Sequence, residues 1–181
     1  MTDLMTIIKE RRSIRKYEEK AFPEEHLLQL LEAVQWSPSW TNNQIWEVVV
    51  VKDPEVKKGL QESLPTSGNP AIKAIVAAPV VLALCGKHES SGFYGGKAST
   101  KFGDWFMFDL GIAAQSICLT AQSLGLGTVI VGLFDHDKAN KVLKTPEGYD
   151  IVAMIPVGYP AKNPPAPPRR AINEFTHNDT F

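Results

Sequence analysis

The sequence predicts one domain, residues 1–181, built on a β-sheet with interleaved helices, of the α+β or α/β class. Four short apolar stretches have the length of strands, and segments with helical spacing lie between them. A long and almost wholly apolar segment, residues 104–124, is a further feature, which a plain doubly wound sheet does not predict. At 181 residues the chain is long enough to bury one hydrophobic core.

The helices follow from caps and apolar periodicity. Asp3, Asp53 and Asp135 each precede a segment with helical spacing and suit the N-cap position. Pro23 and Pro54 suit the first turn of a helix. The predicted helices span residues 3–10, 23–36, 53–62, 104–124 and 135–143.

The strands are apolar stretches bounded by turn-forming residues. We predict them at residues 45–51, 79–84, 128–131 and 151–157. Residues 65–70 read as a loop, and residues 87–101 as an excursion rich in glycine and serine. The tail from residue 160 onward contains a run of prolines and should be extended.

The segment 104–124 has little polar surface in any direction, so we expect a helix that is buried on all sides. Its small residues Gly111, Ala113 and Ala114 would allow another helix to approach closely. A packing role for Asp109 and Gln115 is expected in preference to a catalytic one.

Charge and hydropathy exclude several classes of partner. The formal net charge of −1 gives no basic field for nucleic acid and no acidic excess typical of disorder. The longest apolar run, residues 74–85, is too short for a membrane helix, which needs about 20 residues. The N-terminus lacks the layout of a signal peptide, so a cytoplasmic protein is expected.

The sequence also lacks the common catalytic and metal-binding motifs. No Gly-x-Gly-x-x-Gly follows a predicted strand, and GFYGGKAST lacks the spacing and the hydroxyl residue of a P-loop. The four histidines have no metal-ligand spacing, so no metal site is predicted. Cys85 and Cys118 sit in apolar stretches and are expected to be plain buried thiols. No acid, base or nucleophile stands out as catalytic.

Three polar segments remain to be explained. Arg11, Arg12, Ser13 and Arg15 follow the first helix and offer donors suited to phosphate, although a solvated basic face is the common alternative. The stretch 37–44, SPSWTNNQ, is rich in amide and hydroxyl groups, although such a loop is often only a turn. Arg169 and Arg170 follow the proline run.

Taken together, these segments resemble the nitroreductase family over nearly the whole chain. The resemblance rests on RRSIRKY, SPSWTNNQIW, DLGIAAQSICLTAQSLGLGT and PRRAINEF, in this order and spacing. It implies an α+β nitroreductase-like fold, with a central mixed, mostly antiparallel sheet flanked by helices and a long buried central helix. It also implies an intertwined homodimer, in which the tail 160–181 wraps the partner subunit.

The resemblance further implies bound FMN. Residues 11–13 would contact its phosphate and ribityl chain, and Arg15 would lie near the N1 and O2 edge. The segment 38–44 would reach the flavin of the other subunit, the backbone of 132–133 would lie near N5, and 169–170 would close on the phosphate. The residues thus assigned to FMN are Arg11, Arg12, Ser13, Arg15, Pro38, Ser39, Trp40, Asn42, Gln44, Gly132, Leu133, Arg169 and Arg170.

The chain departs from the family pattern at two positions, because many relatives have a small residue at Trp40 and proline at Ile45. The indole of Trp40 could narrow the substrate pocket, stack on an aromatic substrate or point into the interface. Asn69 and Lys73 could supply further contacts to the flavin edge, but they align only loosely with the family and are not assigned to the site.

The implied activity is ping-pong reduction of a small acceptor, such as a nitroaromatic or a quinone, by NADH or NADPH. The chemistry would take place at flavin N5, which explains why no catalytic side chain stands out. Two alternatives stay open: another flavin reaction on the same fold (dehydrogenation, dehalogenation or flavin fragmentation), and a non-catalytic module that binds a phosphorylated ligand.

Overall fold

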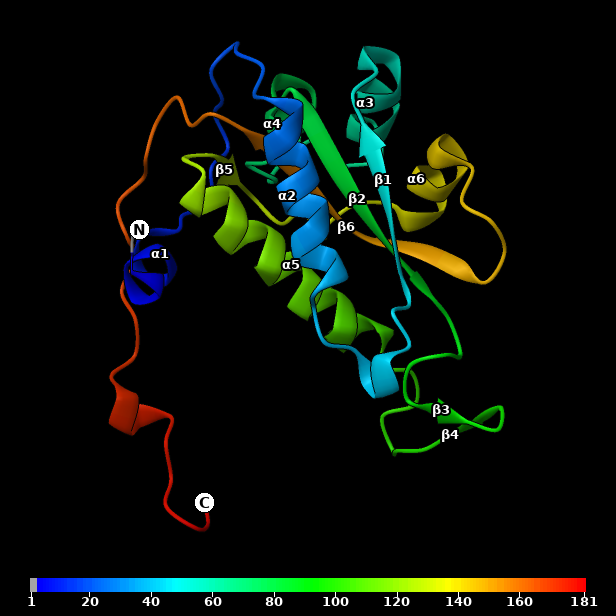
Figure 1. The fold of residues 1–181 in the computed structure, drawn as a ribbon. Helices are drawn as coiled ribbons and strands as arrows, with labels where there is room; N and C mark the ends of the chain where they lie inside the picture. Colours follow the sequence, from blue (N-terminus) through cyan, green and yellow to red (C-terminus); the bar gives the residue numbers. More distant parts are fainter. Residues whose placement is uncertain (1–2) are drawn as a thin grey trace.

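A four-stranded antiparallel sheet in the order β1-β2-β6-β5 lies at the centre of the molecule (Figure 1). The computed structural model describes residues 3–181. The sheet strands are β1 (Trp46–Val51), β2 (Val80–Lys87), β6 (Tyr149–Gly158) and β5 (Gly127–Thr128). A separate hairpin is formed by β3 (Phe93–Tyr94) and β4 (Lys97–Ala98). The helices are α1 (Leu4–Glu10), α2 (Glu24–Gln35), α3 (Pro54–Gln61), α4 (Ile72–Ala77), α5 (Phe106–Ser123) and α6 (His136–Leu143), with short 3₁₀ helices η1 (Trp40–Asn42) and η2 (Ile172–Glu174).

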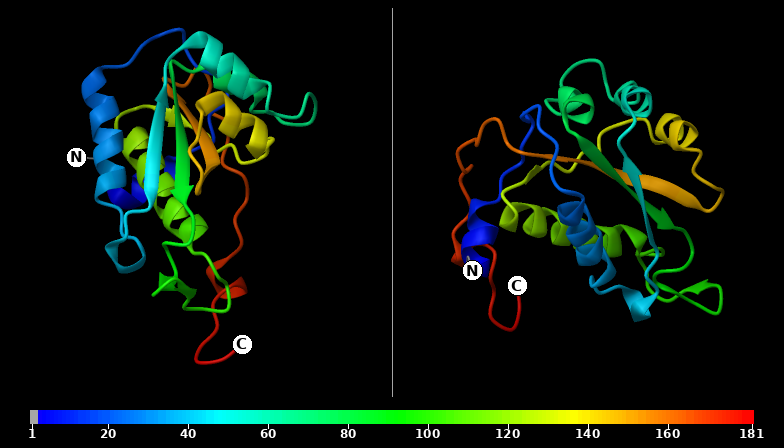
Figure 2. Two further views of the ribbon diagram at one scale, coloured as in Figure 1. Left: turned by 90° about the vertical axis from the view of Figure 1, so that its right-hand side faces the viewer. Right: turned by 45° about the horizontal axis from the view of Figure 1, so that its top comes forward.

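Helices cover both faces of the sheet, α2 and α5 on one and α3, α4 and α6 on the other (Figure 2). The strand β2 separates two hydrophobic cores. Leu82 packs with Ile117 in the core next to α2 and α5, while Val81 packs with Leu60 in the core on the opposite face. Every residue of β2 except the last is buried, as expected for a central strand covered on both faces.

The long helix α5 confirms the predicted element but not its predicted burial. Leu110, Ala113 and Ile117 are buried against the sheet and α2. On the outer side, Met107 is 58% exposed and Phe108 is 59% exposed. This outer side forms a shallow hollow of about 550 Å³, lined by Met107, Phe108, Gly111, Ile112, Gln115, Ser116 and Leu119. The prediction of burial on all sides is therefore wrong for a single chain, which leaves an apolar helix face uncovered.

Within residues 3–181, no helix combines the length and apolar character needed to cross a membrane.

Other differences from the predicted elements are local. The strand predicted at 128–131 is reduced to β5, followed by one isolated bridge between Val131 and Met154. The helix α4 was not predicted, because its sequence IKAIVA merges with the apolar run that leads into β2. The β3-β4 hairpin occupies the excursion 87–101, where Gly95 and Gly96 both adopt positive φ and form the turn. The tail from residue 160 is extended apart from η2.

The segment that follows α1 is fixed along the edge of the sheet. Ser13 forms a parallel bridge with Thr128, and the Ile14 amide donates to the Thr128 carbonyl at 2.8 Å. The Tyr17 hydroxyl contacts the carbonyls of Ile14 at 2.8 Å and Pro156 at 3.0 Å. This short pairing is the parallel component of the otherwise antiparallel sheet. It gives the polar residues 11–15 a defined place beside β5.

Gly127 allows this close approach, and its replacement by alanine should destabilise the protein. A Cβ at Gly127 would lie 2.7 Å from the Ile14 Cβ and 2.5 Å from its Cγ1. Since Ile14 is itself fixed by backbone bonding, we expect Gly127→Ala to lower the free energy of unfolding by about 1–3 kcal/mol. Urea unfolding followed by circular dichroism measures this change at a fixed protein concentration.

The matched control for this prediction is Ile14→Gly, which removes every side-chain atom that the new Cβ would meet, including the Ile14 Cβ. In that background Gly127→Ala should lower the free energy of unfolding clearly less than it does in the wild-type chain. An equal loss of stability in both backgrounds would show that the contact with Ile14 is not the cause.

Candidate functional site

Arginines from the two ends of the chain line one hollow. It has a volume of about 270 Å³, and the polypeptide reaches it from α1 on one side and from the proline-rich tail on the other. Its lining residues are Arg11, Arg12, Ser13, Arg15, Pro164, Pro165, Pro167 and Arg169. The structure thus brings together four of the predicted arginines and Ser13, which lie far apart in the sequence.

These guanidinium groups have no carboxylate partner in the part of the chain that the structure describes. Within residues 3–181, the contacts between a basic side chain and a carboxylate join Lys52 to Glu24 and the His88 imidazole to Asp150. Arg12 donates to the carbonyls of Lys9 and Arg11 at the end of α1, at 2.7 and 2.6 Å. The hollow therefore concentrates positive charge without an internal counter-ion. This donor set fits a phosphate group, which arginine binds through paired N–H donors.

A second, smaller hollow adjoins the first through Arg15, which lines both. It has a volume of about 170 Å³ and contains the predicted residues Gly132 and Leu133. Its remaining lining comes from residues 68–71 and 129–131. Arg15 therefore stands between a phosphate-sized basic hollow and a backbone-lined one, as expected for a ligand with an anionic end and a flat polar end.

Asn69 is a residue of this second hollow to which the sequence assigned no role. Its side-chain amide donates to the Leu133 carbonyl at 3.2 Å, and its carbonyl oxygen accepts from the Ala71 amide at 2.9 Å. Asn69 thereby ties the loop before α4 to the segment that follows β5, at Leu133. The sequence signals for Asn69 are its loose alignment with the family and the Asn-Pro pair at 69–70, which indicates a turn but not a site.

The predicted segment 38–44 forms part of a third hollow, at the start of α5. This hollow has a volume of about 230 Å³ and is lined by Pro38, Ser39, Trp40, Trp105, Phe108, Asp109 and Ile112. The rings of Trp40 and Trp105 lie 5.2 Å apart and are tilted by 46°. Trp40 thus joins an aromatic cluster beside the uncovered face of α5. Asn42 and Gln44 are exposed and have φ angles of 59° and 48°.

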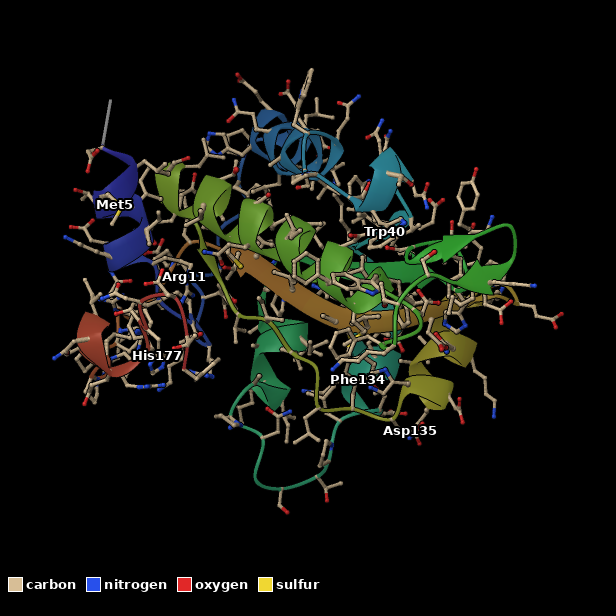
Figure 3. The ribbon with its side chains drawn as sticks, turned by 90° about the horizontal axis from the view of Figure 1, so that it is seen from below. Met5, Arg11, Trp40, Phe134, Asp135 and His177 are labelled. Carbon is tan, nitrogen blue, oxygen red and sulfur yellow. The ribbon has the colours of Figure 1, made fainter. Side chains whose placement is uncertain are left out.

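Within one chain this third hollow lies far from the arginines. The Trp40 amide contacts Asp109 in the first turn of α5, whereas the arginine segment pairs with Thr128 beyond its last turn. An 18-residue helix is about 27 Å long. Figure 3 shows Arg11 and Trp40 near opposite ends of this helix. One protomer does not bring the two predicted segments together.

Comparison with known proteins identifies this combination of fold and segments. The Nitroreductase family profile matches residues 8–74 and 66–159, which together cover most of the chain. This chain belongs to the nitroreductase family.

Relatives of this nitroreductase-family chain match over most of their own length. A protein of Methanothermobacter thermautotrophicus, named provisionally as a NADH dehydrogenase/NAD(P)H nitroreductase, is 33% identical over 90% of this chain and 80% of its own. The FMN reductase [NAD(P)H] of Bacillus subtilis is 29% identical over 100% of this chain and 75% of its own. The crystal structure of an FMN-dependent nitroreductase from Clostridium difficile R20291 is 25% identical, with a TM-score of 0.80, over 98% of this chain and 99% of that one.

Arg170 lies outside the arginine hollow of this nitroreductase-family chain. Its guanidinium donates to the Glu174 carbonyl and lies 5.8 Å from the centre of the Phe175 ring. Arg169, one residue earlier, lines the hollow. The structure therefore separates two adjacent arginines that the sequence could not distinguish.

The cysteines and histidines lie apart from these hollows. Cys85 and Cys118 are buried free thiols, as predicted, and burial raises the pKa of Cys85 to about 11 and also raises the pKa of Cys118. Both thiols are therefore poor nucleophiles near neutral pH. The four histidines are each at least partly exposed, and residues 3–181 contain no cluster of side chains that could hold a metal ion.

Proposed function

We propose that this protein is an FMN-dependent oxidoreductase that accepts electrons from NADH or NADPH and passes them to small acceptors such as nitroaromatics or quinones. The observation that carries the proposal is the arginine hollow, which has no counter-ion among residues 3–181 and is joined through Arg15 to the hollow of Gly132 and Leu133. Two relatives whose names specify FMN, the reductase of Bacillus subtilis and the nitroreductase of Clostridium difficile, support the choice of cofactor.

The residues of this chain would bind FMN along the two adjoining hollows. Arg11 and Arg169 would hold the phosphate, with the Ser13 hydroxyl as a further donor. Arg15 would place a fixed positive charge beside the flavin edge that becomes electron-rich on reduction. When bound, FMN supplies the redox chemistry by accepting a hydride at N5 and releasing the electrons to an acceptor.

This division of labour explains the absence of a catalytic acid, base or nucleophile from the predicted site. The protein would bind and orient the donor, and the acceptor would then occupy the same surface after the oxidised donor leaves, which is a ping-pong sequence. The protein's own contribution is orientation together with the charge of Arg15.

The complete site would require a homodimer. The segment 38–44 and the arginine hollow lie toward opposite ends of α5, and the outer face of α5 is apolar and uncovered. Two copies related by a twofold axis, with their α5 helices antiparallel, would cover this face. The same arrangement would carry the 38–44 loop of one copy toward the arginine hollow of the other. The extended, exposed tail 160–181 would then wrap the second copy.

The proposal is tested by the visible spectrum of the purified protein and by anaerobic mixing with NADH or NADPH. We expect a yellow protein whose flavin absorbance bleaches rapidly and returns when a quinone is added. A yellow protein that is not bleached would favour another flavin reaction on the same fold. A colourless protein that takes up no FMN would instead favour a module for another phosphorylated ligand.

The two neighbouring arginines of the tail provide a matched pair for testing FMN binding. Arg169→Ala should weaken FMN binding by about 1.5–3 kcal/mol, because a charge-assisted phosphate contact is lost, and Arg11→Ala should do the same. Arg170→Ala removes the same charge outside the hollow and should change the affinity little. Titration of the apoprotein with FMN measures the three affinities, and equal losses at 169 and 170 would contradict the placement of the phosphate.

The outer face of α5 should determine the oligomeric state. Leu119→Glu introduces a charge into this apolar face and should yield monomers that retain little FMN, because each site would lose the loop of the other copy. Val76→Glu is the control, since Val76 is 39% exposed on α4, on the opposite side of the sheet. Sedimentation velocity would detect the monomers, and a Leu119→Glu dimer with normal FMN content would exclude this interface.

A further inference from the structure

Asp109 is a buried carboxylate in the first turn of α5, and the proposed chemistry does not use it. It is 1% exposed, and none of the ion pairs of residues 3–181 involves it. The backbone amide of Trp40 donates to its two oxygens at 3.1 and 3.3 Å. The Ser91 hydroxyl donates to Oδ2 at 2.7 Å. A buried carboxylate with these neutral donors, and without a cation, calls for an explanation.

These bonds join three parts of the chain at one point. Trp40 belongs to the loop before β1, Ser91 to the excursion after β2, and Asp109 to α5. Two further contacts strengthen the junction: the Asn43 side-chain amide donates to the Ser90 carbonyl at 2.8 Å, and the Trp105 amide donates to the Ser91 carbonyl at 3.0 Å. Asp109 is the element of this junction that holds the loop backbone directly.

The loop needs such an anchor because its backbone is strained. Thr41, Asn42 and Gln44 have φ angles of 45°, 59° and 48°, in the left-handed region that residues other than glycine rarely adopt. Such conformations persist only where the surroundings enforce them. Residues 41–44 are all exposed, so packing contributes little to their geometry. Besides the bond of the Trp40 amide, the Asn43 side chain ties the loop to the Ser90 carbonyl, and the Gln44 amide donates to the Ser39 hydroxyl at 2.9 Å within the loop.

We propose that Asp109 is a positioning residue that holds the 38–44 loop in its strained conformation, so that Asn42 and Gln44 are presented to the flavin bound by a second copy. This role rests on the proposed function, since it is the flavin that the loop would contact. Asp109 itself is directed at the Trp40 amide and Ser91, and it acts through the loop.

The first test uses Asp109→Ala and Asp109→Asn. Alanine leaves the Trp40 amide and the Ser91 hydroxyl without their acceptor, so the loop should relax. Asparagine keeps an acceptor oxygen for the Trp40 amide, and its NH₂ can donate to the Ser91 hydroxyl oxygen. We expect Asp109→Ala to bind FMN on the order of tenfold more weakly and Asp109→Asn to remain close to the wild type. Asp109→Ala should also raise the KM for a quinone acceptor more than it lowers kcat.

A readout that needs no flavin is the near-ultraviolet circular dichroism of the apoprotein. Trp40 and Trp105 lie 5.2 Å apart, so their indoles should contribute a coupled signal that depends on the position of the loop. This signal should fall in Asp109→Ala and persist in Asp109→Asn. Ser91→Ala removes one of the donors to Asp109 and should cause smaller losses of the indole signal and of FMN affinity. If Asp109→Ala does not fold, Ser91→Ala takes its place in the test.

Leu60→Ala is the control for general destabilisation. Leu60 is fully buried in the core on the opposite face of the sheet, so its truncation should lower Tm without moving the loop. The proposal is overturned by an Asp109→Ala protein that loses thermal stability but keeps the wild-type FMN affinity and indole signal. It is also overturned by a Leu60→Ala protein that loses FMN affinity equally. A wild-type protein without FMN would refute the proposed function, while the indole signals of the variants would still test the anchor.

Discussion

The candidate site depends on the convergence of several guanidinium groups at one place, where residues 3–181 provide no acid to neutralise them. Like charges repel, so an arrangement of this kind lowers the stability of the protein until an anion enters. The chain maintains this arrangement by fixing the two backbone segments that carry the arginines. The pairing of Ser13 and Ile14 with Thr128 fixes the first segment, and the second is rich in proline and has few accessible conformations. A bound phosphate would relieve the repulsion and would also join the two ends of the chain.

The helix α5 imposes the second constraint, because its length separates the two proposed parts of the site. The arginine hollow lies beyond its C-terminal end, and the Trp40 loop lies at its N-terminal end. The uncovered apolar side of the same helix runs between them. An antiparallel pairing of two such helices would resolve both features at once, since it covers the apolar side and moves each loop to the other copy's arginines. A single twofold operation would therefore account both for the exposed helix face and for the separation of the two proposed parts of the site.

The sequence allowed the capped helices to be predicted well, because their signals are local. Asp53 and Asp135 cap α3 and α6 through the side-chain bonds that the sequence suggested. The helix α4 escaped prediction because it has no side-chain cap and lies within a longer apolar run. The reduced strand β5 escaped for a different reason: the chain leaves the sheet after Thr128 to form the wall of a hollow, and residue composition does not record such a departure.

The candidate site was predictable only in part, because its geometry is not local. The segment 11–15 and Arg169 could be selected by resemblance, but no periodicity shows that they meet. Arg169 and Arg170 are identical in type and adjacent in sequence, and only the turn of η2 directs Arg170 toward the Glu174 carbonyl and away from the hollow. The sequence left three possible roles open for the indole of Trp40, and the structure places its ring against Trp105.

Because of the anchor at Asp109, the constraints on the core, on the outer face and on the 38–44 loop all act on the same helix, α5. The inward side of the helix forms a core with α2 and the sheet, its outward side is free for a second copy, and its first turn holds a strained loop. A rigid helix transmits position along its axis, so the placement of Ile117 in the core also determines where Asp109 holds Trp40. The position of the loop is therefore fixed relative to the core of its own protomer, although the flavin it would contact belongs to the other. Precise flavin contacts across a dimer would require such a rigid support, because the four exposed residues 41–44 cannot define their own position.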